Sequence, residues 1–336
     1  MKLVGATIVI AGGGAAGAPA ARSLRRKLGA EHRIILVEQK ETLVNPALLP
    51  LYAVGKKKRR HFSRERSRMS LPGIELTAGR VLKIDPGAKK VYTGGEEIDF
   101  DLLLIATGAE LDRSRPPGAA EAGIDLQSLE GAEKIYAALP YFRGTEIAIV
   151  APSAGIKCPA GPYEYALLLE NWFNRRGRSR DISITIYTSE SAPLILFGER
   201  TSRALAELLL KRRIRLHPGA RIRRIDGESK TIFVDRDRFS YDLLLYYAPV
   251  TPPPLVGESG LAGKGGWLRP DPRTMALPLE SSIFAAGDVT AIDTPRGELL
   301  PKLGAIAHLQ SLVAAANIAR LVKGQKPDRA YCGFAG

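Results

Sequence analysis

Cys158 is the side chain best placed for chemistry, in the stretch Gly155-Ile-Lys-Cys-Pro-Ala-Gly-Pro-Tyr-Glu164. An apolar run typical of a buried strand, residues 146–151, comes before it, and a helix is predicted over 163–170. The N-terminus of a helix carries positive partial charge, which lowers the pKa of a nearby thiol and favours the reactive thiolate. Glu164 is a candidate proton carrier, with a helix-cap partner as the alternative. A buried structural cysteine beside a proline turn is the alternative for Cys158.

The cysteine content favours redox chemistry over a stabilising crosslink. The chain of 336 residues contains two cysteines, Cys158 and Cys332, and no recognisable secretion signal. Its length is typical of two domains, and 45% hydrophobic and 25% charged residues are ordinary values for a globular protein. No apolar run reaches the roughly 18 residues of a transmembrane helix, and no metal site is predicted. We therefore expect a cytoplasmic protein.

The chain is strongly basic, with a formal net charge of +14 and a dense cluster at residues 56–60. Such a surface attracts an anionic membrane, an acidic protein or a nucleic acid, and a simply solvated basic surface is the alternative. Because no nucleic-acid motif accompanies the charge, we expect no nucleic-acid partner. Peripheral association with the inner face of the cell membrane and homo-oligomerisation both stay open.

A dinucleotide-binding motif opens the chain. A β-branched strand is predicted over 7–11, and Gly12, Gly14 and Gly17 then satisfy the G-x-G-x-x-G pattern. A second strand, 33–37, ends at Glu38. In this context the glycines bring the backbone close to a pyrophosphate, and the acid binds a ribose hydroxyl. The motif predicts binding of an ADP moiety.

The order of elements predicts an α/β protein with two Rossmann-like domains. The second is inserted in the first and lacks a nucleotide fingerprint after its first strand, at 151–161. We place the discontinuous dinucleotide-binding domain at 1–112 and 255–336, and the second domain, which carries Cys158, at 113–254. Proline- and glycine-rich stretches mark both crossings. In the returning segment a helix is predicted over 305–323, with Leu309, Leu312, Val313 and Ala316 on its core face.

These motifs resemble a known family. Gly12-x-Gly14-x-x-Gly17, Ala106-Thr-Gly108 and Ala286-Gly-Asp288 resemble flavoproteins of the disulfide reductase and type II NADH dehydrogenase group. Cys158-Pro-x-x-Pro-Tyr-Glu164, Pro301-Lys-x-Gly304 and Cys332 are similar to sulfide:quinone oxidoreductases and to the flavoprotein subunit of flavocytochrome c sulfide dehydrogenase. The resemblance covers essentially the whole chain, although the third cysteine of many quinone-linked members is missing.

The resemblance implies FAD as the cofactor. It assigns Asp288 to the ribityl–pyrophosphate region and Lys302 to the pyrimidine edge of the flavin. The full set of residues that it assigns to the cofactor is Gly12, Gly14, Ala15, Ala16, Gly17, Glu38, Asn45, Pro46, Val81, Thr107, Gly108, Gly287, Asp288, Lys302 and Gly304.

The resemblance also implies a reaction. Hydrosulfide attacks a Cys158–Cys332 disulfide or a sulfur-bridged form of it, two electrons pass to FAD, and sulfur leaves as a chain or in the zero-valent state. A quinone is the expected electron acceptor. A cytochrome acceptor, a nicotinamide-linked flavin oxidoreductase and a non-catalytic FAD-binding redox or assembly protein are the alternatives.

Overall fold

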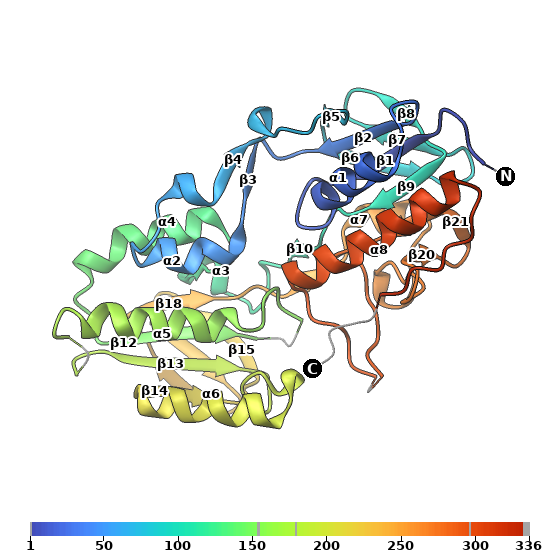
Figure 1. The fold of residues 1–336 in the computed structure, drawn as a ribbon. Coiled ribbons are helices and arrows are strands. Elements are labelled where there is room, and N and C mark those ends of the chain that lie inside the picture. Colours follow the sequence, from blue (N-terminus) through green and yellow to red (C-terminus); the bar gives the residue numbers. More distant parts are fainter. Residues whose placement is uncertain (1, 153–154, 179, 296, 332–336) are drawn as a thin grey trace. The chain divides into compact units, whose positions relative to one another are not determined.

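The computed structural model describes residues 2–152, 155–178, 180–295 and 297–331, which form two compact units (Figure 1). Unit 2 consists of Val44–Ser63 and Leu111–Val250, and unit 1 contains the rest of the described chain. The expected boundaries placed residues 44–63 in the first domain, so the structure differs there. The reason is hydrophobic: α2 (Leu49–Ala53) packs on helices of unit 2, and its apolar side chains are buried in the core of that unit.

Unit 1 is built on a sheet with the strand order β20-β21-β9-β1-β2-β5. All neighbouring pairs are parallel except β20–β21. The central strands are continuous apolar runs because both faces of the sheet are covered. The strands are β1 (Thr7–Ala11), β2 (Arg33–Glu38), β5 (Glu75–Ala78), β9 (Leu102–Ile105), β20 (Ala276–Leu277) and β21 (Glu280–Ala285).

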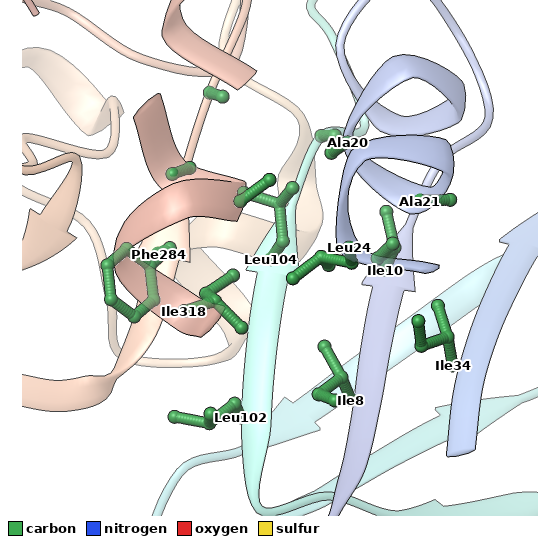
Figure 2. Packing of buried hydrophobic residues seen from close by; sticks show 14 of the residues in the cluster. Ile8, Ile10, Ala20, Ala21, Leu24, Ile34, Leu102, Leu104, Phe284 and Ile318 are labelled. Atoms are coloured by element: carbon green, nitrogen blue, oxygen red, sulfur yellow. The ribbon is translucent and has the colours of Figure 1, made fainter. Parts of the chain in front are cut away.

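Alternate residues of β1 pack into two different clusters, as the period of a strand requires. Ile8 and Ile10 pack with α1 (Gly17–Lys27) and α8 (Gly304–Val322), and Figure 2 shows this cluster. Val9 and Ala11 pack in the other cluster, with the antiparallel sheet β6 (Val81–Asp85), β7 (Lys90–Thr93) and β8 (Glu97–Asp99) and with α7 (Pro254–Glu258).

Unit 2 repeats this plan with the fully parallel sheet β11-β18-β12-β13-β14. Helices α2, α4, α5 and α6 contribute to the core on one face, and the antiparallel sheet β15-β16-β17 with α3 packs on the other. The elements are α3 (Ala119–Ala122), β11 (Ile124–Asp125), α4 (Leu129–Ala138), β12 (Glu146–Ala151), α5 (Gly161–Asn174), β13 (Ser183–Thr188), α6 (Glu199–Lys211), β14 (Ile214–His217), β15 (Ile222–Asp226), β16 (Thr231–Val234), β17 (Asp237–Ser240) and β18 (Leu243–Tyr246).

Two short strand pairs lie where the chain passes between the units. They are β3 (Thr42–Val44) with β4 (Ser63–Glu65), and β10 (Glu110–Leu111) with β19 (Val250–Thr251). Each pair joins an outgoing and a returning segment of the chain. At each crossing, the segment that leaves unit 1 is therefore hydrogen-bonded to the segment that returns to it.

The core face of α8 differs in part from the expected one, because Val313 packs against the core but Leu309 does not. Leu309 is 44% exposed, whereas Ala314, Ala315 and Ala319 are buried among the alanines of α1. Small side chains let the two helix backbones approach closely, so the alanines occupy the contact and the leucine turns outward. Among the described residues α8 is the one helix long and apolar enough to cross a bilayer, yet more than half of that stretch is buried, which fits a core helix.

The fully buried Asn317 of α8 holds the segment that follows the helix. Its amide nitrogen donates to the carbonyl oxygens of Thr274 and Arg329, at 3.0 and 2.9 Å. Its amide oxygen accepts from the backbone N–H groups of Asp328 and Arg329, at 3.2 and 3.0 Å. The side chain of Asn317 thus uses all its hydrogen-bonding capacity to fix the backbone after α8. The backbone N–H of Tyr331 also donates to the carbonyl oxygen of Arg273, which fixes the last described residue.

Asn317→Ala is therefore expected to destabilise unit 1 by about 2–4 kcal/mol, because it leaves buried backbone groups without partners. Chemical denaturation of the two proteins, followed by circular dichroism, measures this loss. Asn174→Ala, at the exposed end of α5, is the matched control and should change stability by less than about 0.5 kcal/mol. Equal stability of Asn317→Ala and the wild type would show that the clamp contributes nothing.

Candidate functional site

The turn between β1 and α1 has the steric pattern that the glycine motif predicts. A Cβ added at Gly17 would lie 1.7 Å from the carbonyl oxygen of Gly12, so only glycine lets the helix start this close to the strand end. A Cβ at Gly14 would meet nothing within 4 Å. The backbone N–H groups of Gly14, Ala15 and Ala16 find no acceptor among the described residues. The turn thus presents free donors and open space at a helix N-terminus, which is the environment a pyrophosphate needs.

Glu38 closes one side of this turn. It is 5% exposed, and its carboxylate oxygens accept the backbone N–H groups of Gly13 and Lys40, each at 2.7 Å. A carboxylate oxygen has two lone-pair sites, so each oxygen keeps capacity for a second donor. The geometry therefore leaves Glu38 able to bind a ribose hydroxyl while it fixes the turn.

Three further predicted segments of unit 1 meet at the same edge of the sheet. A Cβ on Gly12 would overlap the carbonyl group of Ala106, which directly precedes Thr107 and Gly108. The Cβ position of Gly287 lies 3.3 Å from that of Ala16, and the Cβ position of Gly304 lies 4.0 Å from that of Ala15. The carboxyl ends of β1, β9 and β21 and the start of α8 are thus brought together, as expected for a site at the end of a parallel sheet.

Three polar side chains in this region could hold a ligand. The hydroxyl of Thr107 is buried and has no hydrogen-bond partner within the described part of the chain. Asp288 and Lys302 line one hollow together with Gly287, Thr290 and the start of α8. Lys302 also donates to the carbonyl oxygen of Thr290, and its ammonium lies 4.0 Å from the centre of the Trp267 ring. These residues fit an ADP-containing flavin dinucleotide, and their individual roles stay predictions.

Three other predicted residues are described in other surroundings, and a fourth is not described by the structure. Asn45 and Pro46 belong to unit 2, where the Asn45 side chain caps a short 3₁₀ turn by accepting from Ala47 at 3.2 Å. Val81 is 8% exposed and packs in the core of unit 1. Cys332 lies outside the described residues. The roles assigned to these four stay predictions.

Cys158 lies in unit 2, in the loop between β12 and α5, and it is half-buried. Its backbone has a φ of 55°, in the left-handed region that residues with a side chain seldom adopt. Its carbonyl oxygen accepts the N–H of Gly161, the first residue of α5, at 2.8 Å. Strain of this kind costs on the order of 1–3 kcal/mol and concentrates at functional sites. The loop thus fixes a thiol beside a helix N-terminus.

Gly161 lets α5 start against a buried tyrosine. Tyr247 follows β18, the neighbour of β12 in the sheet, and it is 3% exposed. A Cβ on Gly161 would lie 1.9 Å from the Tyr247 hydroxyl oxygen. Burial raises the pKa of Tyr247 well above its usual value, and charges at Tyr165 and Cys158 act in the same direction. Tyr247 therefore stays a neutral phenol close to Cys158.

Two carboxyl groups lie near the start of α5. Burial raises the pKa of Glu164, in the first helical turn. Burial also raises the pKa of Glu190, which follows β13, while the hydrogen bond from the Tyr163 hydroxyl at 2.5 Å opposes that rise. The site can therefore hold a proton near Cys158 at higher pH than an exposed carboxyl group could.

Tyr247 and Glu190 were not predicted from the sequence. Tyr247 directly follows β18, and Glu190 follows β13 after one intervening residue. The carboxyl ends of these parallel strands share the edge that carries Cys158. That shared edge is the signal that identifies them. Among the described residues no group of three or more histidine, cysteine, aspartate or glutamate side chains is arranged to hold a metal ion.

Comparison with known proteins gives one family match over most of the chain. The family described as pyridine nucleotide-disulphide oxidoreductase matches residues 6–317. The sulfide:quinone oxidoreductase of mouse mitochondria is 25% identical over 97% of this chain and 74% of its own length. The sulfide-quinone reductase of Aquifex aeolicus is 26% identical over 96% of this chain and 78% of its own length.

A solved structure gives the same result for the fold. The crystal structure of the sulfide:quinone oxidoreductase from Aquifex aeolicus superposes with a TM-score of 0.86, at 24% identity, over 96% of this chain and 78% of that chain. The expected fold class and the expected resemblance are both confirmed.

The two glycines of the β1–α1 turn should respond differently to substitution. Gly14→Val places a side chain in open space, so it should abolish FAD binding without changing the stability of the FAD-free protein. Gly17→Ala forces a methyl group into the Gly12 carbonyl, so it should lose FAD and also destabilise the FAD-free protein by about 3 kcal/mol or more. Flavin absorbance and chemical denaturation measure these effects. FAD retained at wild-type affinity in Gly14→Val would contradict the cofactor assignment.

The raised pKa of Glu164 sets a sign for stability against pH. The folded state binds the proton more tightly than the unfolded state, so this contribution is fully present below about pH 4.5 and is lost as pH rises through the raised value. Relative to the wild type, Glu164→Gln should therefore gain stability between pH 4 and pH 7. Denaturation midpoints at both pH values measure the difference, and a constant difference would contradict the burial argument.

Proposed function

Because the chain belongs to the pyridine nucleotide-disulphide oxidoreductase family, we propose that it oxidises sulfide through Cys158 and passes the electrons by way of FAD to a quinone. The chain is an FAD-dependent oxidoreductase. Two relatives that match nearly the whole of this chain are named for sulfide and quinone, which supports the proposed substrate and acceptor.

The observation that carries the proposal is the conformation of the Cys158 loop. In a nucleotide-binding half-domain the turn after the first strand leaves the helix N-terminus open for phosphate. Here the first N–H of α5 is bonded to the Cys158 carbonyl, and a carboxyl group with a raised pKa stands in the first turn. The turn that would bind a nucleotide holds a thiol instead, which supports sulfur chemistry in unit 2.

FAD, when bound, supplies a two-electron acceptor. The open turn at Gly14 and the donors of residues 14–16 would hold its pyrophosphate, and Glu38 would bind a ribose hydroxyl. The orphan hydroxyl of Thr107 and the Asp288 carboxylate would bind further polar atoms of the cofactor. Lys302 would add positive charge near the start of α8, where the helix N-terminus already favours negative charge.

The protein's own step is a thiol–disulfide exchange. Hydrosulfide forms a bond to the Cys158 sulfur as the Cys158–Cys332 bond breaks, which leaves a persulfide on Cys158 and a thiolate on Cys332. Over the full cycle hydrosulfide loses two electrons and one proton, and sulfur leaves at the zero-valent level. The bound cofactor would accept the two electrons, and a carboxyl group of the protein would take the proton. The disulfide re-forms, so the protein is unchanged at the end.

Glu164 is the group we propose to carry the proton. Its pKa is raised by burial, which brings the carboxyl group closer to the working pH of a general acid or base. Tyr247 packs against the same helix start, where its buried phenol is neutral. The proton of hydrosulfide can therefore be held at the carboxyl group while the exchange proceeds.

Unit 2 is poorly suited to a nicotinamide dinucleotide, so mixing with NADH under anaerobic conditions should leave the flavin oxidised, whereas sulfide should bleach it. The turn after β12 lacks the glycine fingerprint, and the first N–H group of α5 is bonded to the Cys158 carbonyl oxygen. Stopped-flow absorbance of the flavin band measures both reactions. Rapid bleaching by NADH alone would contradict the proposal and would identify the protein as a nicotinamide-linked flavin oxidoreductase.

The two cysteines should act as one redox unit. Cys158→Ser and Cys332→Ser should each lose at least about 100-fold in sulfide-dependent flavin reduction, and the double variant should be little worse, because groups that act together are not additive. FAD content should stay near normal. Cys158→Gly, which relieves the positive φ, should be as inactive as Cys158→Ser but at least as stable. Normal sulfide turnover in Cys332→Ser would end the disulfide mechanism.

A further inference from the structure

Unit 2 contains a cavity of about 210 Å³ that the sulfur chemistry does not use. It lies between the chain after α2 and the last turn of α5, two elements that pack together in this unit (Figure 1). Cys158 precedes the opposite end of α5, and the helix spans Gly161–Asn174. At about 1.5 Å of rise per residue the cavity is roughly 20 Å from the thiol along the helix. It is therefore a separate site.

The cavity is positively charged. Lys56, Arg175 and Arg176 line it, and no acidic residue does. None of the three forms an ion pair with a carboxylate in the described parts of the chain, and the carboxylates of Glu133 in α4 and Glu170 in α5 have other partners. Glu133 binds Arg59 at 3.1 Å, and Glu170 binds Arg212 at 2.9 Å. Three cations thus converge on one hollow without a counter-charge, which is an arrangement that favours an anionic ligand.

The guanidinium group of Arg176 is held in place, and the backbone of Lys56 is anchored. The Arg176 guanidinium lies 3.6 Å from the centre of the Trp172 ring and donates to the Trp172 carbonyl oxygen at 3.1 Å. The backbone N–H of Lys56 donates to the Leu51 carbonyl oxygen at 2.8 Å. A guanidinium held by a cation–π contact and a hydrogen bond loses little freedom when it binds a ligand.

We propose that this cavity binds the phosphate group of a small aliphatic phosphomonoester, either free in solution or as the headgroup of an anionic lipid. Two arginines and a lysine match a doubly charged phosphate, since arginine binds phosphate oxygens through paired N–H groups. Val54 and Leu168 form an apolar wall against which a short carbon chain can pack. The Asn171 amide adds a neutral hydrogen-bonding group.

The geometry disfavours a nucleotide in the same place. Base stacking needs an exposed aromatic face, but Trp172 is 9% exposed and Arg176 lies over its ring. A volume of about 210 Å³ is also below the roughly 300–1,000 Å³ of pockets that enclose larger organic ligands. The occupant is therefore a compact anion with at most a short aliphatic part.

The test compares two triple variants of equal charge in the FAD-loaded protein. Lys56→Ala/Arg175→Ala/Arg176→Ala removes the cations of the cavity, and Arg200→Ala/Arg203→Ala/Lys211→Ala removes three exposed cations of α6. Glycerol 3-phosphate is titrated by calorimetry, and sedimentation is measured with phosphatidylcholine vesicles with and without phosphatidic acid. The wild type and the α6 variant should bind, and the cavity variant should bind at least tenfold more weakly.

The vesicle and calorimetry arms separate the two sources of phosphate. Binding of glycerol 3-phosphate that is lost in the cavity variant identifies a soluble ligand, and binding only to phosphatidic acid vesicles, lost in the same variant, identifies a lipid headgroup. Equal losses in the two triple variants would overturn the proposal, because they would reflect general charge. Failure of the wild type to bind either probe would also overturn it. Circular dichroism, FAD content and sulfide bleaching verify that each variant is folded.

Discussion

Both units depend on one constraint, which is that a helix starts in close contact with the end of a strand. The strand is the one that precedes the helix in unit 1 and a neighbouring strand of the sheet in unit 2. In unit 1 the first residue of α1, Gly17, touches the carbonyl of Gly12, and in unit 2 the first residue of α5, Gly161, touches the hydroxyl of Tyr247. A single methyl group would overlap these atoms. Glycine at these two positions therefore fixes where each helix begins. The start of the helix in turn determines which backbone groups and side chains of the preceding loop are available to a ligand.

The same architecture then serves two kinds of chemistry. In unit 1 the N–H groups after Gly13 stay open and Gly14 faces empty space, so the helix N-terminus can accept a phosphate. In unit 2 the corresponding turn is occupied by its own loop, because the Cys158 carbonyl accepts from Gly161 and Cys158 adopts a left-handed backbone. Cofactor binding and the thiol are thus divided between two copies of one design.

The sequence predicted the elements whose signals are local. The apolar strand before Gly12, the helix after Gly17 and the acid at Glu38 follow from periodicity and motif spacing, and the structure has β1, α1 and β2 there. The antiparallel sheet β15-β16-β17 was not foreseen, because its short strands mix apolar positions with several arginines, as in Ile222–Asp226. Such strands gain their stability from packing on the parallel sheet, which no local pattern encodes.

The candidate site was predictable to a different degree in each unit. The spacing of Gly12, Gly14 and Gly17 in the sequence is enough to predict the geometry of their turn. The contact of Tyr247 with Gly161, in contrast, depends on the parallel pairing of β12 with β18, which the sequence does not show. Leu309 was wrongly placed on the core face of α8, because close packing of two helices favours the smaller alanine side chain at the contact. Tertiary packing decided each of these cases.

The central claim is that Cys158 accepts the sulfur of sulfide. The most direct measurement is mass spectrometry of the peptide that contains Cys158, after the oxidised protein is mixed anaerobically with one equivalent of sulfide, quenched at low pH and alkylated. The account predicts that this peptide carries one additional sulfur atom, and that Glu164→Gln alters the pH dependence of its formation. A Cys158 peptide that gains no sulfur at any quench time before the flavin is fully reduced would contradict it.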